Sequence, residues 1–182
     1  VAMAVLLALG WWLLSPSSPW TAQTWPDVAG SDCPLPPAAE WCQAPLQTPL
    51  SSPGTVWRFK QAQLTPQAGF SVAARVLGVE RYRWDGGSDW SPVDLALGWH
   101  AMSEDNLLQQ LRLSQSRRFY YYQARTKWPL SPQQIGLMSS NMHMIPANRY
   151  VARQLAKIKP QQRVRIDGWL VNLRGDNGSS WH

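Results

Sequence analysis

The positive charge of this chain is confined to its last two thirds, which limits where a folded domain can form. The chain has 182 residues, and no Lys or Arg occurs before Arg58. Residues 15–54 hold repeated Pro and Ser without hydrophobic periodicity, a composition that cannot build a core and stays extended. We therefore expect a Pro/Ser-rich linker over 15–54 and one basic domain over 55–182, which contains all 17 basic residues.

The first 14 residues, VAMAVLLALGWWLL, form an apolar run. They are too few to cross a bilayer, which takes about 20 residues, but the chain begins with Val, so we expect upstream residues to be missing. Trp11, Trp12 and Trp20 stand where an interfacial aromatic belt lies. The run is typical of a truncated transmembrane anchor or signal segment. An anchor is favoured because no A-x-A cleavage site follows; a buried helix of a soluble protein is the remaining interpretation.

By the positive-inside rule, the flank without Lys or Arg that follows this run lies on the translocated side of the membrane. Outside the cytoplasm, Cys33 and Cys42 in SDCPLPPAAEWCQ are expected to form a local disulfide that closes a short Pro-rich loop. A metal site on this pair is disfavoured, because the spacing is not C-x-x-C and no His is close by.

Residue patterns predict strands and short helices within the basic domain. Strands are predicted where β-branched and aromatic residues dominate or alternate: 55–59, 70–84, 117–124 and 164–173. Helices are predicted where a capping residue precedes an apolar or amphipathic run: 91–99, 103–113, 131–138 and 147–158. In the first helix Ser91 is the cap and Asp94 completes a capping box, and Ser103 caps the second.

These elements predict a small α+β domain, built around a curved antiparallel sheet or partly open β-barrel with short inserted helices. DGG at 85–87 is a turn, and GDNG at 175–178 is a hairpin turn whose second arm, SSWH, is short. Because a hairpin with one arm exposes a strand edge, we expect the chain to be a fragment that is truncated at both ends.

Aromatic and acidic side chains gather in RYRWDGGSDWSPVDLALGWHAMSED. Trp84 and Trp99 are candidate ligand-binding residues, and His100 is a weak catalytic candidate. Asp85 and Asp89 flank a Gly-rich turn, where two carboxylates could bind a hard cation. Asp in such a turn more often bonds its own backbone, and we favour that interpretation.

A second candidate site lies in SSNMHMIPAN, 139–148. If this stretch is extended, Ser139, Asn141 and His143 face one way. His143 could then act as a general base and Ser as a nucleophile, with Asp94 as a further catalytic candidate, although no G-x-S-x-G elbow surrounds a Ser. The favoured interpretation is that Asn141 and His143, which are also ligand-binding candidates, bond backbone groups and hold the loop.

A third candidate is the basic and aromatic stretch RRFYYYQARTKW, 117–128. Arg beside Tyr and Phe on a strand is typical of surfaces that stack bases or sugars, so Arg117 and Arg118 are candidate binding residues. The same pattern fits a sheet that buries one face and shows Arg on the other. No P-loop, H-E-x-x-H or paired C-x-x-C is present, and we expect no cofactor and no metal.

Four motifs suggest a family. They are SPVDLALGW (91–99), LSQSRRFYYYQ (113–123), SSNMHMIPA (139–147) and VRIDGWLVNL (164–173). In this order they resemble an uncharacterised family of small bacterial membrane-anchored proteins, over roughly 70–182. The resemblance implies a bacterial source, a membrane segment, and a chain that continues past Trp181 toward a further Cys. It implies no activity, because the family has none established.

From these features we expect a membrane-anchored binding or assembly module of the bacterial envelope. It would lie on the periplasmic side of the inner membrane, with an envelope protein or an anionic polymer as partner. One alternative is a hydrolase of an anionic polymer, with His143 as base and Arg117 or Arg118 holding the anion. The other is a nucleic-acid-binding module, which the extracytoplasmic location disfavours. Whether the chain is an enzyme stays open.

Overall fold

The computed structural model describes residues 25–28, 33–41, 43–50 and 54–182. One long strand, β3 (Ala62–Arg81), organises this part of the chain. Along one edge it pairs with β8 (Arg163–Gly175). Along its other edge it pairs in turn with three strands: β2 (Trp57–Phe59), β1 (Leu46–Pro49) and β4 (Val93–Gly98). All of these pairs are antiparallel.

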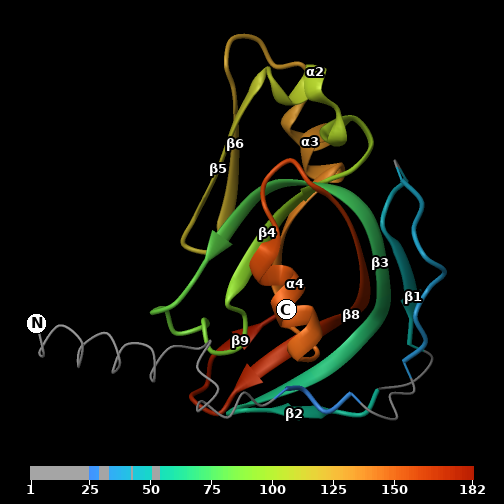
Figure 1. Ribbon diagram of the computed structural model, residues 1–182, viewed down its shortest axis with the longest axis vertical. Coiled ribbons are helices and arrows are strands. Elements are labelled where there is room, and N and C mark those ends of the chain that lie inside the picture. Colours follow the sequence, from blue (N-terminus) through green and yellow to red (C-terminus); the bar gives the residue numbers. More distant parts are fainter. Residues whose placement is uncertain (1–24, 29–32, 42, 51–53) are drawn as a thin grey trace, which may run out of the picture.

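Two further strands complete this sheet. β7 (Ser139–Met144) pairs with β4, and β9 (Ser180–Trp181) pairs with β8, so the strand order is β7-β4-β3-β8-β9. The register of β3 shifts twice, between Pro66 and Ala68 and between Val76 and Gly78. Because bulges bend a strand and increase its twist, β3 curls the whole sheet into a half-barrel (Figure 1).

A separate hairpin projects from one end of the half-barrel (Figure 1). It consists of β5 (Leu111–Ser116) and β6 (Phe119–Ala124), and it stands beside the short helices α2 (Asp105–Leu108) and α3 (Pro132–Leu137). Leu111 packs there with Met102 and Ile135 in a small core. The last helix, α4 (Arg149–Lys157), buries Leu155 in the main core instead.

The domain is therefore mostly sheet, with a strongly curled half-barrel and few short helices. The predicted curved antiparallel sheet is confirmed, as are strands at 55–59, 117–124 and 164–173 in the form of β2, β6 and β8. The predicted helices at 131–138 and 147–158 are confirmed as α3 and α4.

The helix predicted at 91–99 is wrong. This segment forms β4, which is buried at every position from Val93 to Gly98. A short apolar run cannot be assigned to helix or strand by periodicity, and the Ser-Pro start imitates a helix cap. Asp94 consequently caps no helix, and its side chain is fully buried.

The helix predicted at 103–113 is also wrong for most of its length. The structure has a 3₁₀ turn, η1 (His100–Ser103), one turn of α2, and then β5. Ser103 caps nothing, because its Oγ donates to the carbonyl of His100 at 2.7 Å. Leu111 and Leu113 alternate into the small core, and this period of two favours a strand.

Part of the range predicted as a linker contacts the sheet. β1 pairs with β3, and Trp169 donates its ring N–H to the carbonyl of Cys33 at 3.0 Å. The backbone N–H of Ala39 donates to Ser71 Oγ at 2.8 Å. An extended Pro-rich chain can lie as an edge strand, so this stretch of 15–54 packs on the domain. Cys42 lies outside the described residues, and its predicted disulfide with Cys33 stays a prediction.

The predicted anchor at 1–14 also lies outside the described residues. Among the residues that are described, no helix combines the length and apolarity needed to cross a membrane.

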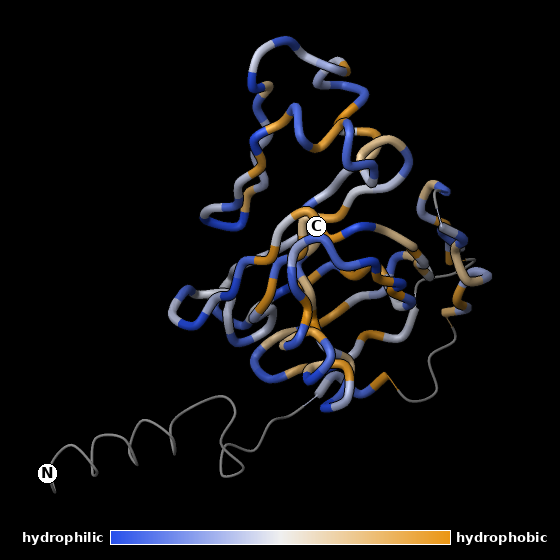
Figure 2. The backbone as a smooth tube through the Cα atoms, turned by 45° about the horizontal axis from the view of Figure 1, so that its top comes forward, coloured by the Kyte–Doolittle hydropathy of each residue, from blue (hydrophilic) through white to orange (hydrophobic). Residues whose placement is uncertain are grey.

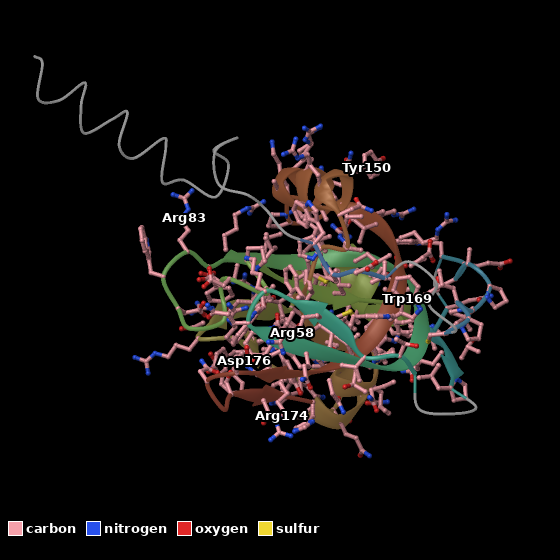
Figure 3. The ribbon with its side chains drawn as sticks, turned by 90° about the horizontal axis from the view of Figure 1, so that it is seen from below. Arg58, Arg83, Tyr150, Trp169, Arg174 and Asp176 are labelled. Carbon is pink, nitrogen blue, oxygen red and sulfur yellow. The ribbon has the colours of Figure 1, made fainter. Side chains whose placement is uncertain are left out.

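An ion pair fastens the turn that follows β8. Arg58 of β2 and Asp176, which comes directly after β8, lie 2.8 Å apart, and Figure 3 shows the two side chains close together. The predicted GDNG turn thus joins β8 to β9 and is tied to β2.

Candidate functional site

The fully buried carboxylate of Asp94 is the centre of the best-defined polar site. Its Oδ1 accepts a hydrogen bond from Arg118 Nη1 at 3.0 Å. Its Oδ2 lies 2.9 Å from His143 Nδ1 and accepts from Asn141 Nδ2 at 3.1 Å. The alternation of side chains along β7 places Asn141 and His143 on one face, and the β4–β7 register sets Asp94 opposite His143.

Arg118 enters the site from the turn of hairpin β5–β6. Its Nε and Nη2 donate to the two carboxylate oxygens of Asp85 at 2.7 and 2.8 Å. Nη1 also donates to the carbonyl of Ser91 at 2.9 Å. The guanidinium lies 3.7 Å from the ring centroid of Tyr82, a cation–π contact. We call Asp85, Asp94, Arg118, Asn141 and His143 the Asp94 cluster.

Charge pairing sets the ionisation of this cluster. The hydrogen bonds from Arg118 hold the pKa of Asp85 below its usual value. Burial opposes the charge of Arg118, whose side chain is 15 % exposed, but Asp85 and Asp94 outweigh burial and raise its pKa. Burial raises the pKa of Tyr82, so its hydroxyl stays protonated at neutral pH. That hydroxyl accepts the backbone N–H of Arg118 at 2.9 Å.

Asn141 joins three elements through one amide. Its Nδ2 donates to Asp94 and also to the backbone carbonyl of Arg118 at 3.1 Å, while its Oδ1 accepts from Gln115 at 2.7 Å. Strands β4 and β7 and hairpin β5–β6 are therefore fastened at one point. The favoured prediction gave Asn141 backbone partners in a loop; its partners here are the side chains of Asp94 and Gln115 and one backbone carbonyl, and it lies in strand β7.

His143 and Asp85 are the members of the cluster that keep access to solvent, and the side chain of each is 36 % exposed. The ring centroid of His143 lies 5.3 Å from that of Trp181. Nδ1 faces Asp94, which leaves Nε2 for another partner. A carboxylate at Nδ1 orients a histidine as in serine-hydrolase triads. Among the features of the cluster, this orientation is the one that most favours a role for His143 as a general base.

The structure brings some of the predicted site residues together in the Asp94 cluster and places the others elsewhere. Asp94, Arg118, Asn141 and His143 meet, although they lie on three elements. Trp99 is buried in the main core, whereas Trp84 is highly exposed. His100 lies past the far end of β4, away from Asp94. Arg117 is exposed at the tip of the hairpin.

Four residues of this site were missed as site residues in the sequence: Tyr82, Asp85, Ser91 and Trp181. Asp85 was predicted as a turn former, and its carbonyl does accept from Ser88 within the turn. Its carboxylate, however, binds Arg118. No sequence spacing marks this pairing, because the two residues come from a loop and a distant hairpin. No group of three or more potential metal ligands occurs among the described residues.

The exposed side of hairpin β5–β6 is the second candidate surface. The register pairs Ser114 with Tyr121 and Ser116 with Phe119, so these side chains share one face. Phe119 is 64 % and Tyr121 51 % exposed, with ring centroids 6.5 Å apart. We call this surface the outer hairpin face; its residues are Arg112, Ser114, Ser116, Phe119, Tyr121 and Gln123.

No protein-family model, curated protein or solved structure matches this chain.

Proposed function

We propose that this chain is a binding module that holds an anionic polymer on the outer hairpin face. The observation that carries the proposal is the pair of exposed aromatic rings, Phe119 and Tyr121, on a hairpin that is rich in arginine. Large exposed aromatic side chains on a soluble surface mark interaction sites, and aromatic rings stack on sugars and bases.

The charge around the hairpin supports an anionic ligand. Residues 106–166 contain eleven Lys and Arg and no Asp or Glu. On the hairpin and the segment after it, four of these are exposed: Arg112, Arg117, Arg125 and Lys127. Figure 2 shows hydrophilic residues along this projecting part of the chain. A patch of one charge attracts a polyanion over about a Debye length, roughly 8 Å at physiological salt.

The Asp94 cluster supports a structural role for Arg118 in this module. All three guanidinium nitrogens of Arg118 donate to protein acceptors, so this arginine is committed to holding the hairpin. The neighbouring Arg117 is exposed and faces solvent at the tip. The hairpin is thereby presented on a fixed base, which lowers the entropy lost when a ligand binds.

The setting that we propose is the periplasmic face of a bacterial inner membrane. It rests on the apolar run at 1–14 and on the absence of Lys and Arg before Arg58. In that compartment an acidic polysaccharide of the envelope is a more accessible polyanion than nucleic acid. We therefore take an acidic polysaccharide as the ligand class.

A fluorescence titration with polygalacturonate tests this function. The test variant carries Phe119→Ser and Tyr121→Ser, and the control is Tyr150→Ser, which removes a tyrosine that is 70 % exposed on α4. We expect the double variant to bind at least about tenfold more weakly, and the control to bind like the parent. Affinity should fall as sodium chloride rises from 50 to 300 mM.

Three outcomes would contradict the proposal. One is equal binding by parent and double variant. Another is binding of neutral dextran as tight as that of polygalacturonate. The third is a clear preference for single-stranded DNA, which would favour the nucleic-acid alternative.

The Asp94–His143 geometry supports a second candidate, a hydrolase with His143 as general base. Its expected anion-binding partner Arg118 is engaged by Asp85, Asp94 and Ser91, which leaves Arg117 for that role. The test is product release from polygalacturonate by the parent and by His143→Gln. Turnover that His143→Gln abolishes, with stability retained, would favour this candidate.

A further inference from the structure

A cavity of about 760 Å³ lies against β7 and β8 of the half-barrel, and the proposed polymer site does not use it. Its walls are mostly apolar. Cavities of about 300–1,000 Å³ with such walls are typical binding sites for small molecules. We call it the core cavity, because seven members of the main core line it: Phe70, Trp99, Met142, Met144, Val151, Ile166 and Leu170.

The N-terminal segment of the chain covers one end of the core cavity. Pro26 and Val28 line this end, where Val28 packs on the second hydrophobic cluster together with Trp169 and Val171. The other end lies over the main core, and apolar side chains there, such as that of Leu170, are only partly buried. The space that a ligand could fill is therefore the part over the main core.

Gly168 leaves open space on the side of β8 that faces the main core. Ile166, Gly168 and Leu170 alternate along the strand, so they share one face, and Ile166 and Leu170 pack on the main core. Gly168 itself pairs with the buried Phe70. A Cβ added at Gly168 would meet no atom of the described residues within 4 Å. Because protein interiors contain few voids, this gap indicates room for a ligand.

A second cavity, of about 430 Å³, continues the core cavity along α4. The two cavities share Met144, Val151, Ile166 and Asp167 in their walls. The smaller cavity extends to Lys157, the last residue of α4. Together the two form an elongated and mostly apolar space, which suits an unbranched hydrocarbon chain. We call this space the α4 groove.

The end of the α4 groove at the last turn of α4 is cationic. Lys157 and Arg165 line it, and both are exposed. Arg165 is paired with Asp167 at 3.2 Å, whereas the side chain of Lys157 has no hydrogen-bonding or ionic partner among the described residues. A cation without a partner, next to an apolar groove, complements an anionic group on an apolar chain.

We propose that the α4 groove binds a fatty carboxylate, with its hydrocarbon chain over Gly168 and its carboxylate at Lys157. Removal of the chain from water drives binding, and Lys157 selects an anionic head group over a neutral one. The proposal goes beyond the polymer-binding function and is independent of it, because the α4 groove contains no residue of the outer hairpin face.

Calorimetric titration of the 182-residue chain with decanoate tests where the hydrocarbon chain binds. Gly168→Leu places a side chain in the open space, so we expect decanoate to bind at least about tenfold more weakly than to the parent. Its thermal unfolding midpoint should equal or exceed that of the parent, because the variant fills a cavity. Gly168→Ala is the matched control, and it should bind like the parent. Uptake of decanoate by the apolar run at 1–14 would be the same in all three proteins.

A second pair of variants tests the head group, with decanol as the neutral analogue of decanoate. Lys157→Met replaces an exposed residue and should preserve the fold. We expect it to weaken decanoate binding about tenfold and to leave decanol binding unchanged. The control is Arg149→Met, which removes an exposed cation from the other end of α4, and it should bind both compounds like the parent.

Four results would overturn the proposal. They are the absence of decanoate binding to the parent, equal decanoate binding by the parent and Gly168→Leu, decanol binding to the parent as tight as that of decanoate, and no effect of Lys157→Met. Polygalacturonate binding by Gly168→Leu separates this inference from the proposed function, because it should match that of the parent whether or not decanoate binds.

Discussion

At the scale of single residues, Asp94 and Arg118 give the clearest energetic argument. A carboxylate that is fully buried is costly unless charged and hydrogen-bonding partners surround it. Here Arg118, Asn141 and His143 supply them. Removing Arg118 from its ion pair with Asp94 costs about 3–5 kcal/mol, because the buried charge of Asp94 is left without its cation. The first role of the Asp94 cluster is therefore to stabilise the folded chain.

Asp85→Asn is predicted to remove a pH-dependent part of the stability. The pKa of Asp85 is lower in the folded chain than in the unfolded chain, so its contribution is present above about pH 4 and is lost as pH falls through the folded pKa. Its side chain is partly exposed, which makes the effect modest. Urea unfolding at pH 7, 5 and 3 should show the variant destabilised at pH 7, with a smaller difference from the parent at pH 3. A difference that stays constant with pH would contradict this prediction.

Asn141→Ala is predicted to destabilise the chain more than His143→Ala. Asn141 makes three hydrogen bonds within the cluster, whereas His143 faces Asp94 through one nitrogen and is partly exposed. At roughly 1 kcal/mol for each hydrogen bond, the losses are about 3 and 1 kcal/mol. Thermal unfolding monitored by circular dichroism measures both. The reverse order would mean that His143 is the main structural anchor.

At the scale of elements, the turn of hairpin β5–β6 carries unusual backbone geometry. Arg117 and Arg118 have φ of 51° and 72°, a region that favours Gly and Asn. Type I′ two-residue hairpin turns have positive φ at both central positions and favour Asn-Gly. Arg-Arg therefore carries no turn signal, and the strand predicted at 117–124 begins two residues before β6. The contacts of Arg118 hold this turn in place.

Gly substitutions at the two turn positions are predicted to act in opposite directions. Arg117→Gly removes backbone strain from an exposed residue and should stabilise the chain by about 0.5–1 kcal/mol. Arg118→Gly relieves the same strain but deletes the partner of Asp85 and Asp94, so it should destabilise by several kcal/mol. Chemical unfolding of the two variants compares them directly. Equal effects would mean that the turn geometry, and not the cluster, decides the stability of the hairpin.

The two Ser-Pro segments show how far local signals predict elements. Ser131 does cap α3, where it forms a capping box with Gln134, as the sequence indicates. Ser91 precedes an equally suggestive run that forms β4 instead. The difference is burial, because β4 lies between β3 and β7 with every residue buried, and tertiary packing overrides a local cap. In α4, where burial is one-sided, the periodicity was sufficient to predict the helix.

At the scale of the whole molecule, the curved sheet was predictable and its organisation was not. Strand-forming patterns indicated a curved antiparallel sheet, but the length of β3 was underestimated because Pro66 and Gly69 interrupt its pattern. A bulge accommodates Gln67, and the strand continues. The Asp94 cluster was predictable only as separate candidates. Its members meet because the strand register and the hairpin turn bring four sequence segments together.

A double-mutant cycle on Asp94 and Arg118 tests whether the Asp94 cluster fastens hairpin β5–β6, and so the outer hairpin face, to the half-barrel. Unfolding free energies are measured for the parent, Asp94→Asn, Arg118→Met and the double variant. We predict single losses of about 3–5 kcal/mol and a coupling energy of about 2 kcal/mol or more. Single variants that fail to fold beside a double variant that folds would support the same conclusion. Additive losses, with a coupling energy near zero, would contradict the claim.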